Sequence, residues 1–195
     1  MWYEVSSGMY FFIIPLLLGF TFNAASALTA AYSRRWGEKE GSLVTVVLRD
    51  ILGIPVWAIG FLMAVRAPSP RLFTKTGVSQ AAGFVLVGAG ALIILIALSS
   101  IRSRAAAPSA RDHLVRTGLY GRMRHPIHSG TLLELAGLLL LRPTRAVAIA
   151  CALGFVWVLV QTGLEEYDLR QRLPDYRDYM GQVPRFLPRL HPKKR

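Results

Sequence analysis

Uncharged, mostly apolar runs alternate with short charged segments along the chain. Three of these runs carry no charged residue and cover Val5–Ser33, Thr76–Ile101 and Ala146–Leu164. About 20 apolar residues are needed to cross a hydrocarbon core of roughly 30 Å, so each run predicts a transmembrane helix. The first run is far longer than the apolar part of a signal peptide and lacks its basic flank, which predicts a helix that is retained.

Two weaker runs predict two further spans. The run Ser42–Val65 is interrupted by Arg49 and Asp50, which we interpret as a neighbouring pair that eases its own burial. The run Ile127–Leu141 is short, contains Glu134, and is separated from the last span by a short link. These patterns predict an all-α integral membrane protein of about five transmembrane helices, in which spans four and five form a helical hairpin.

The composition agrees with a membrane protein. Hydrophobic residues make up 53% of the chain and charged residues 17%, whereas a soluble domain carries about 25% charged residues. This balance disfavours a disordered chain, a disulfide-rich secreted scaffold and an ordinary soluble enzyme. A single cysteine excludes an internal disulfide, and we expect residues 1–195 to form one domain.

The basic residues predict the orientation. The net charge is +12, and with five spans and the C-terminus inside, 17 of the 23 Lys and Arg residues fall in cytoplasmic segments. The positive-inside rule then places the C-terminal region in the cytoplasm, and the predicted location is the cell inner membrane. Membrane topology and anionic lipids account for the charge, so we expect no nucleic-acid partner.

Polar residues that could carry chemistry lie beside the ends of the last two spans. Arg124-His125-Pro126 precedes the fourth span, and Glu165-Glu166 ends the fifth. The hairpin returns both groups to one membrane face, so we expect them to be neighbours around a cytoplasmic pocket for a zwitterionic ligand. Each group also has a simpler interpretation, as interfacial anchors for the first and as a surface ion-pair network for the second.

Glu134 is a functional candidate because ionisable groups within a membrane span are costly and rare. It shares one helix face with Gly130 and Gly137, which suits close helix packing, and a structural hydrogen bond is the alternative role. Tyr176 and Tyr179 have an equally simple alternative, as members of an aromatic belt at the interface.

The histidines give only a weak indication of a metal site. His113, His125 and His128 lie close together in the sequence, but no Cys or His set has the ligand spacing typical of zinc. We therefore expect no bound metal.

Several residues within about residues 101–190 occur in an order that is typical of one protein family. They are Leu114-Val115, Gly118, Tyr120, Arg124-His125-Pro126, Gly130, Glu165-Glu166, Tyr176, Tyr179 and Pro184-Arg185. In this order the chain resembles the isoprenylcysteine carboxyl methyltransferase family, whose wider relatives include membrane phospholipid N-methyltransferases. The resemblance implies a multi-span helical enzyme that uses S-adenosyl-L-methionine, releases S-adenosyl-L-homocysteine and admits a lipophilic substrate from the bilayer.

The resemblance also implies roles for individual residues. Tyr120 would pack near the adenosyl group, His125 would help to hold the cofactor, and Glu165 would pair with its amino group. Arg124 and backbone N–H groups would favour the carboxylate of the cofactor. The cofactor-binding set carried over from the family consists of Leu114, Val115, Tyr120, His125, Pro126, Glu165 and Glu166.

Two positions depart from the family pattern. His128 stands where the family usually has an aromatic residue, and Gln161 stands where the carboxyl methyltransferases carry an Arg associated with substrate. The missing guanidinium removes the bidentate partner of a carboxylate acceptor. Gln161 could instead orient a neutral or amine acceptor, and His128 could accept its proton. The predicted catalytic set is Arg124, His128, Gln161 and Glu134.

We therefore predict an S-adenosylmethionine-dependent methyltransferase that resembles protein-S-isoprenylcysteine O-methyltransferase. Residues 1–100 would form the N-terminal helices, 101–190 the cofactor-binding and catalytic region, and 191–195 a basic tail. The expected partners are a lipophilic substrate and membrane lipids. The alternatives are an N- or S-methyltransferase for phospholipids or other small lipophiles and, from another class, a small membrane transporter or a lipid-binding scaffold.

Overall fold

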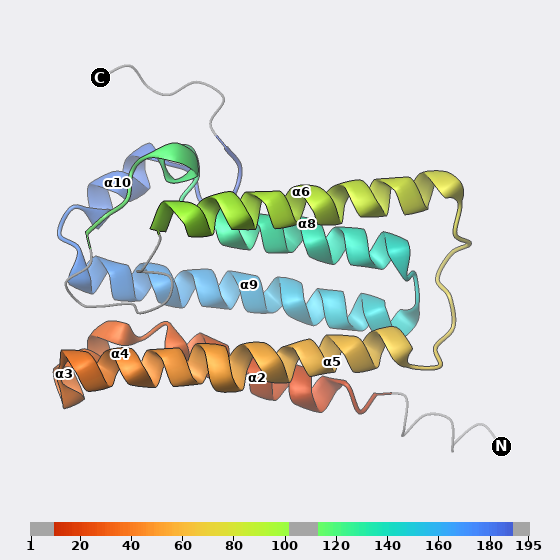
Figure 1. Cartoon of the computed structure of the whole chain (residues 1–195), viewed down its shortest axis with the longest axis horizontal. Coiled ribbons are helices and arrows are strands. Elements are labelled where there is room, and N and C mark those ends of the chain that lie inside the picture. The colour runs from red at the N-terminus through yellow and green to blue at the C-terminus, as the bar shows by residue number, and fades with distance from the viewer. Residues whose placement is uncertain (1–9, 102–112, 189–195) are drawn as a thin grey trace.

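The computed structural model describes residues 10–101 and 113–188, and these residues fold into helices joined by short links (Figure 1). The predicted runs Thr76–Ile101 and Ile127–Leu141 agree with helices to within one residue, whereas the helix that contains the run Ala146–Leu164 continues to Arg172. In chain order they are α2 (Ile13–Ser26), α3 (Thr29–Trp36), α4 (Glu38–Val46), η1 (Val47–Gly53), α5 (Ile54–Arg66), α6 (Gly77–Ile101), η2 (Gly118–Gly121), α8 (Pro126–Leu141), α9 (Arg145–Arg172) and α10 (Tyr176–Gln182).

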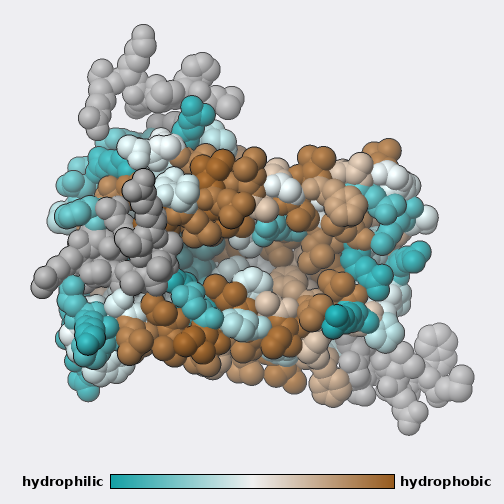
Figure 2. All heavy atoms as spheres, in the orientation of Figure 1, coloured by the Kyte–Doolittle hydropathy of each residue, from teal (hydrophilic) through white to brown (hydrophobic). Residues whose placement is uncertain are grey.

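Among the described residues, three helices are long and apolar enough to cross a membrane: the continuous helix over Glu38–Arg66, α6 and α9. A fourth span is added if α2 and α3 count as one, and α8 is a shorter apolar helix. Large apolar side chains such as Phe84 and Val85 on α6 are about two-thirds exposed, which suits lipid contact. Figure 2 shows apolar side chains over the middle of the molecule and more hydrophilic ones toward both ends.

The first predicted span is bent rather than continuous. The axes of α2 and α3 differ by 63°. At the start of α3 the backbone N–H of Ala30 donates to the buried Asp168 carboxylate of α9 at 2.7 Å. A carboxylate at a helix N-terminus satisfies a free donor and the helix dipole. This contact ties α3 to α9 and explains why the chain turns there.

Arg49 and Asp50 within the second span pair with one another, as predicted, but Asp50 is exposed rather than buried. Nε of Arg49 donates to Oδ1 of Asp50 at 2.8 Å, and a second bond joins the same two side chains at 2.9 Å. The pair lies in the π-helical segment η1, which is continuous with α4 and α5. π-helical turns are rare and are frequent at functional sites.

The helices form two layers with α9 between them (Figure 1). On one side α6 packs against α8, where the backbones approach closely at glycines. A Cβ atom added to Gly90 would lie 2.5 Å from the carbonyl oxygen of Gly130, and one added to Gly137 would lie 2.7 Å from that of Gly83. On the other side α2 packs against α5, and both contact α9. Small residues are typical of close helix pairs in membranes.

The segment after α9 folds back over one end of the bundle. Leu173, Tyr176, Tyr179 and Val183 form a buried cluster, against which Leu114 packs. As a result α10 and η2 lie together beside the start of α8 and the end of α9 (Figure 1). This end of the bundle holds the polar residues that the sequence singles out.

Candidate functional site

A cavity of about 1090 Å³ extends through the bundle between the two layers. Cofactor and ligand pockets commonly measure about 300–1,000 Å³, so this one has room for a cofactor together with an acceptor. Figure 2 shows the molecule hollowed between two bands of apolar side chains. Ten of the predicted site residues line the cavity: Leu114, Val115, Tyr120, Arg124, His125, Pro126, His128, Glu134, Gln161 and Glu165.

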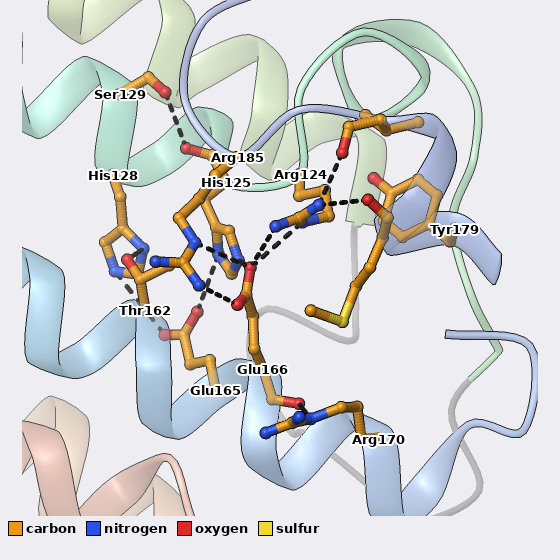
Figure 3. Close-up of polar contacts among 12 residues, drawn as sticks. Arg124, His125, His128, Ser129, Thr162, Glu165, Glu166, Arg170, Tyr179 and Arg185 are labelled. Carbon is orange, nitrogen blue, oxygen red and sulfur yellow. Dashed lines mark hydrogen bonds and ion pairs between the residues drawn. The ribbon is translucent and has the colours of Figure 1, made fainter. Parts of the chain in front are cut away.

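Glu166 is the centre of a buried ion-pair network rather than a wall of the cavity. Its carboxylate accepts from Nε and Nη2 of Arg124 at 3.1 and 2.9 Å, and from Nε of Arg185 at 3.1 Å (Figure 3). Nη2 of Arg185 makes a further contact, and Nε2 of His125 lies 3.2 Å away. Only 3% of the Glu166 side chain is exposed. A buried carboxylate needs such pairing, and Glu166 therefore holds Arg124, His125 and Arg185 against the end of α9.

Arg124 is committed to the same network. Its Nη1 donates to the carbonyl oxygens of Met180 and Val183, both at 2.7 Å. These carbonyls lie at the end of α10, where a guanidinium satisfies unpaired acceptors. The donors of Arg124 already bind Glu166 and α10, so its contact with a cofactor carboxylate stays a prediction, and the structure gives Arg124 a role in holding α10. The sequence could not show this, since the carbonyls of a later segment leave no pattern.

Backbone bonds attach the segment after α10 to the start of α8. The N–H of Arg124 donates to the carbonyl of Pro184 at 2.8 Å, and the N–H of His125 donates to that of Arg185 at 3.0 Å. The hydroxyl of Ser129 donates to the carbonyl of Phe186 at 2.8 Å. Together with the Glu166 network these bonds hold the His125 side chain in a fixed orientation.

His125 lies between the two carboxylates. Its Nε2 faces Glu166, and its Nδ1 lies 3.5 Å from Oε2 of Glu165. Burial lowers the pKa of His125, but the neighbouring carboxylates Glu165 and Glu166 outweigh this effect and the pKa is raised. The simpler interpretation of Glu165-Glu166 as a surface network therefore fails for Glu166, which is buried.

Glu165 turns toward the cavity, where Gln161, His125 and His128 surround its carboxylate. Nε2 of Gln161 donates to Oε1 of Glu165 at 3.0 Å, and Nε2 of His128 lies 3.7 Å from the same oxygen. On the opposite side of the His128 ring, Nδ1 lies 3.1 Å from the hydroxyl of Thr162. Figure 3 shows both imidazole rings extending from α8 and its N-cap toward Glu165 on α9. Thr162, three residues before Glu165 on the same helix face, is a site residue that the sequence analysis missed.

Tyr120, Tyr176 and Tyr179 belong to this end of the bundle rather than to an aromatic belt alone. The hydroxyl of Tyr179 donates to the carbonyl oxygen of Tyr120 at 2.5 Å. Burial, followed by the charge of Glu165, raises the pKa of Tyr120, and burial raises the pKa of Tyr179 to about 12. Both phenols stay neutral at physiological pH and act through packing and hydrogen bonds.

Glu134 lies apart from this cluster. It is on α8 six residues beyond His128, about 9 Å along the helix axis, and its Cγ lies against Gly90 of α6. Gly130, Glu134 and Gly137 all lie against α6, as their shared helix face predicts. Glu134 also lines the cavity. Arg49 and Asp50 line the cavity as well.

No protein-family model matches the chain, and comparisons with curated proteins and with solved structures also find no match.

Proposed function

We propose that this protein is an S-adenosylmethionine-dependent methyltransferase that acts on a lipophilic acceptor within the membrane. The observation that supports this most directly is one cavity with two kinds of wall. Its polar end is formed by Glu165, Gln161 and His125, and its apolar part by residues such as Trp57 and Phe61. A charged cofactor and a hydrophobic acceptor need these two environments side by side.

The residues at the polar end suit the methionine part of the cofactor. Glu165 is a carboxylate beside the cavity, where it would hold the ammonium group. Within the described chain, Oε1 of Gln161 is buried without a hydrogen-bond partner, so it has capacity for a donor from a ligand. Leu114, Val115 and Tyr120 would receive the adenosyl group. When bound, the cofactor supplies an electrophilic methyl group on a sulfonium.

The chain itself has to orient the acceptor and exclude water. Nε1 of Trp57 and of Trp157 are buried without partners within the described residues, and both side chains line the cavity. These two donors could fix the polar head of an acceptor against the aromatic wall. His128 would accept a proton from an amine or thiol acceptor, and Gln161 would orient it. Arg124 acts as a positioning residue, because its donors are used by Glu166 and α10.

We also propose the five-span topology, in which α8 completes the set of membrane helices. The end of the bundle that carries α3, η2 and α10 would then face the cytoplasm, with the C-terminal region and the site on that side. The basic segments beside these elements fit the positive-inside rule, and the cell inner membrane is the location that we propose.

The decisive experiment is calorimetric titration of S-adenosylmethionine and S-adenosylhomocysteine into the detergent-purified protein. We expect micromolar binding that Glu165→Gln abolishes. Glu40→Gln, which changes an exposed carboxylate on α4, is the matched control and should bind normally. Absence of binding to folded protein, with or without added lipid, would refute the proposed function.

Substrate identity is tested by methyl transfer from radiolabelled S-adenosylmethionine. Prenylcysteine, phosphatidylethanolamine and a simple long-chain thiol represent the carboxylate, amine and thiol acceptors. Because Gln161 replaces an arginine, we expect the amine or thiol to be preferred over the carboxylate. Gln161→Arg should shift this preference toward prenylcysteine, and an unchanged preference would contradict the role of Gln161.

A second candidate function is supported by the reach of the cavity. Arg49, Asp50 and Glu134 line it from helices that cross the apolar part of the bundle, and intramembrane charges often mark a transport pathway. A transporter would move its substrate across vesicles in response to an ion gradient. Flux that Glu134→Gln abolishes, in protein that does not bind the cofactor, would favour this alternative.

A further inference from the structure

The arrangement around Glu165 contains more than a cofactor contact needs. His125, His128 and Glu165 each place one nitrogen or oxygen atom within 4.8 Å of the others. Both imidazoles are buried. The two distances to Glu165 are 3.5 Å from Nδ1 of His125 and 3.7 Å from Nε2 of His128, longer than the 2.7–3.2 Å that is usual for an N–H···O hydrogen bond.

These separations suit ligands of a common ion. Zinc binds His nitrogen and carboxylate oxygen at about 2.0–2.2 Å in tetrahedral geometry, which puts neighbouring ligand atoms about 3.4 Å apart. The two distances end on different oxygens of Glu165 and are within about 0.3 Å of that edge. One atom from each of the three residues lies within 4.8 Å of the others, so binding requires side-chain rotations that draw the ligands together.

Hydrogen-bond accounting shows where the His128 proton lies. The hydroxyl of Thr162 donates its only hydrogen to the carbonyl of Val158 at 2.6 Å, so it can only accept from Nδ1 of His128. In the neutral ring, Nε2 of His128 then carries a lone pair that faces the Glu165 carboxylate.

The same reasoning applies to His125. The carboxylate of Glu166 can only accept, so Nε2 of His125 donates to it, and Nδ1 is the ring atom that faces Glu165 and would bind a metal after losing its proton. One nitrogen of each ring and the Glu165 carboxylate therefore face a common point. A metal ion there would replace the His125 proton opposite the carboxylate.

Each of the three groups also has a partner that fixes its orientation. Glu166 holds His125, Thr162 holds His128, and Nε2 of Gln161 holds Glu165. Metal-binding histidines almost always donate their other ring nitrogen in this way, and metal-binding carboxylates are hydrogen-bonded in turn. All three groups line the cavity, which leaves a fourth position open to a water or a ligand.

We propose that His125 through Nδ1, His128 through Nε2 and Glu165 bind a divalent transition metal, with Zn²⁺ or Co²⁺ as the ion of matching chemistry. The ligand spacing along the sequence gives only a weak indication of this site, because the third ligand, Glu165, lies on a different helix. The inference goes beyond the proposed function. Because Glu165 is shared, the metal and the ammonium group of the cofactor exclude one another.

The test uses the full chain, purified in detergent without a polyhistidine tag and stripped with a chelator. Co²⁺ alone is titrated while its visible absorption is followed, and Zn²⁺ then displaces it. We expect one equivalent per chain with the absorption of a four-coordinate ion. His128→Gln and Glu165→Gln should abolish the spectrum, whereas His113→Gln, which removes an exposed histidine, should leave it unchanged.

Thr162→Val separates a metal site from a folding defect. It keeps all three ligands and the shape of the side chain but removes the partner of Nδ1 of His128. We expect metal affinity to fall about 10–100-fold, the usual effect of losing such a partner, in protein whose circular dichroism shows the wild-type helical fold in the absence of metal. Unchanged affinity, substoichiometric Co²⁺, or a spectrum that survives in His128→Gln would each overturn the proposal.

The outcomes also separate this proposal from the proposed function. Cofactor binding without metal binding would overturn the metal site and leave the methyltransferase proposal intact. Metal binding without cofactor binding would do the reverse. If both bind, saturating Zn²⁺ should weaken S-adenosylmethionine binding in the wild type, and simultaneous full occupancy would contradict a shared Glu165.

Discussion

Glu166→Gln tests whether the network around Glu166 holds the site together. The substitution keeps the size of the side chain and removes the charge that balances Arg124, of which 9% is exposed, and Arg185, of which 41% is exposed. Breaking a buried ion pair typically costs about 3–5 kcal/mol. Arg124 keeps the carbonyls of Met180 and Val183, so we expect the lower end, about 3 kcal/mol.

The corresponding change in melting temperature is measurable. For a chain of this size 1 kcal/mol shifts Tm by about 2–4 °C, so Glu166→Gln should lower it by about 6–12 °C. Arg185→Gln is the internal control. Its partly exposed guanidinium can be solvated, and we expect a loss of about 1 kcal/mol or less.

The assay is thermal unfolding in detergent, followed by intrinsic tryptophan fluorescence and by circular dichroism at the same protein concentration. A Tm within 2 °C of wild type for Glu166→Gln would refute the reasoning. So would an Arg185→Gln variant that is as unstable as Glu166→Gln, because burial would then not decide the cost.

Three further predictions concern packing, protonation and a single hydrogen bond. Gly90→Ala should destabilise the α6–α8 pair by about 1–3 kcal/mol, because its Cβ would lie 2.5 Å from a backbone oxygen; Gly88→Ala, with open space at the same helix, should be neutral or stabilising in the same thermal assay. Burial lowers the pKa of His125, but Glu165 and Glu166 raise it by a larger amount, so the net shift is upward. The charged ring therefore stabilises the fold at low pH, and this contribution is lost as the pH rises through the raised pKa. The Tm advantage of the wild type over His125→Gln, measured with chelator present, should therefore be largest below about pH 6.5, and an advantage that grows with pH would contradict the assignment. Tyr179→Phe should cost about 1–3 kcal/mol because it leaves the Tyr120 carbonyl without its donor, whereas Tyr167→Phe, at an exposed position, should change Tm little.

The long helices could be predicted because bilayer thickness imposes a simple pattern on composition. The charge-free run Thr76–Ile101 and the helix α6 agree within one residue at their start. The bend between α2 and α3 could not be predicted in this way, because its cause is the Asp168 carboxylate of a distant helix. Local sequence carries no record of such a contact.

The site shows the same division between local pattern and distant contact. The hairpin and the polar ends of its helices predict that His125 and Glu165 meet, and they lie 3.5 Å apart at Nδ1 and Oε2. That Glu165 lines the cavity whereas Glu166 binds two arginines could not be predicted from their positions in the sequence. Successive residues point about 100° apart on a helix, so one carboxylate faces the cavity and the other the C-terminal segment. Which direction each takes depends on how α9 is rotated against α8.

The backbone bonds between Arg124, His125 and the segment 183–186 have a consequence for biosynthesis. A chain grows from its N-terminus at about 5–20 residues per second, so α6 and the hairpin of α8 and α9 are complete before Arg185 is joined to the chain. Until then Glu166 lacks one of its two guanidinium partners, and the carbonyls of Met180 and Val183 that receive Arg124 are themselves made only after α9. The network that completes the polar end of the cavity can therefore close only after every membrane helix has been synthesised.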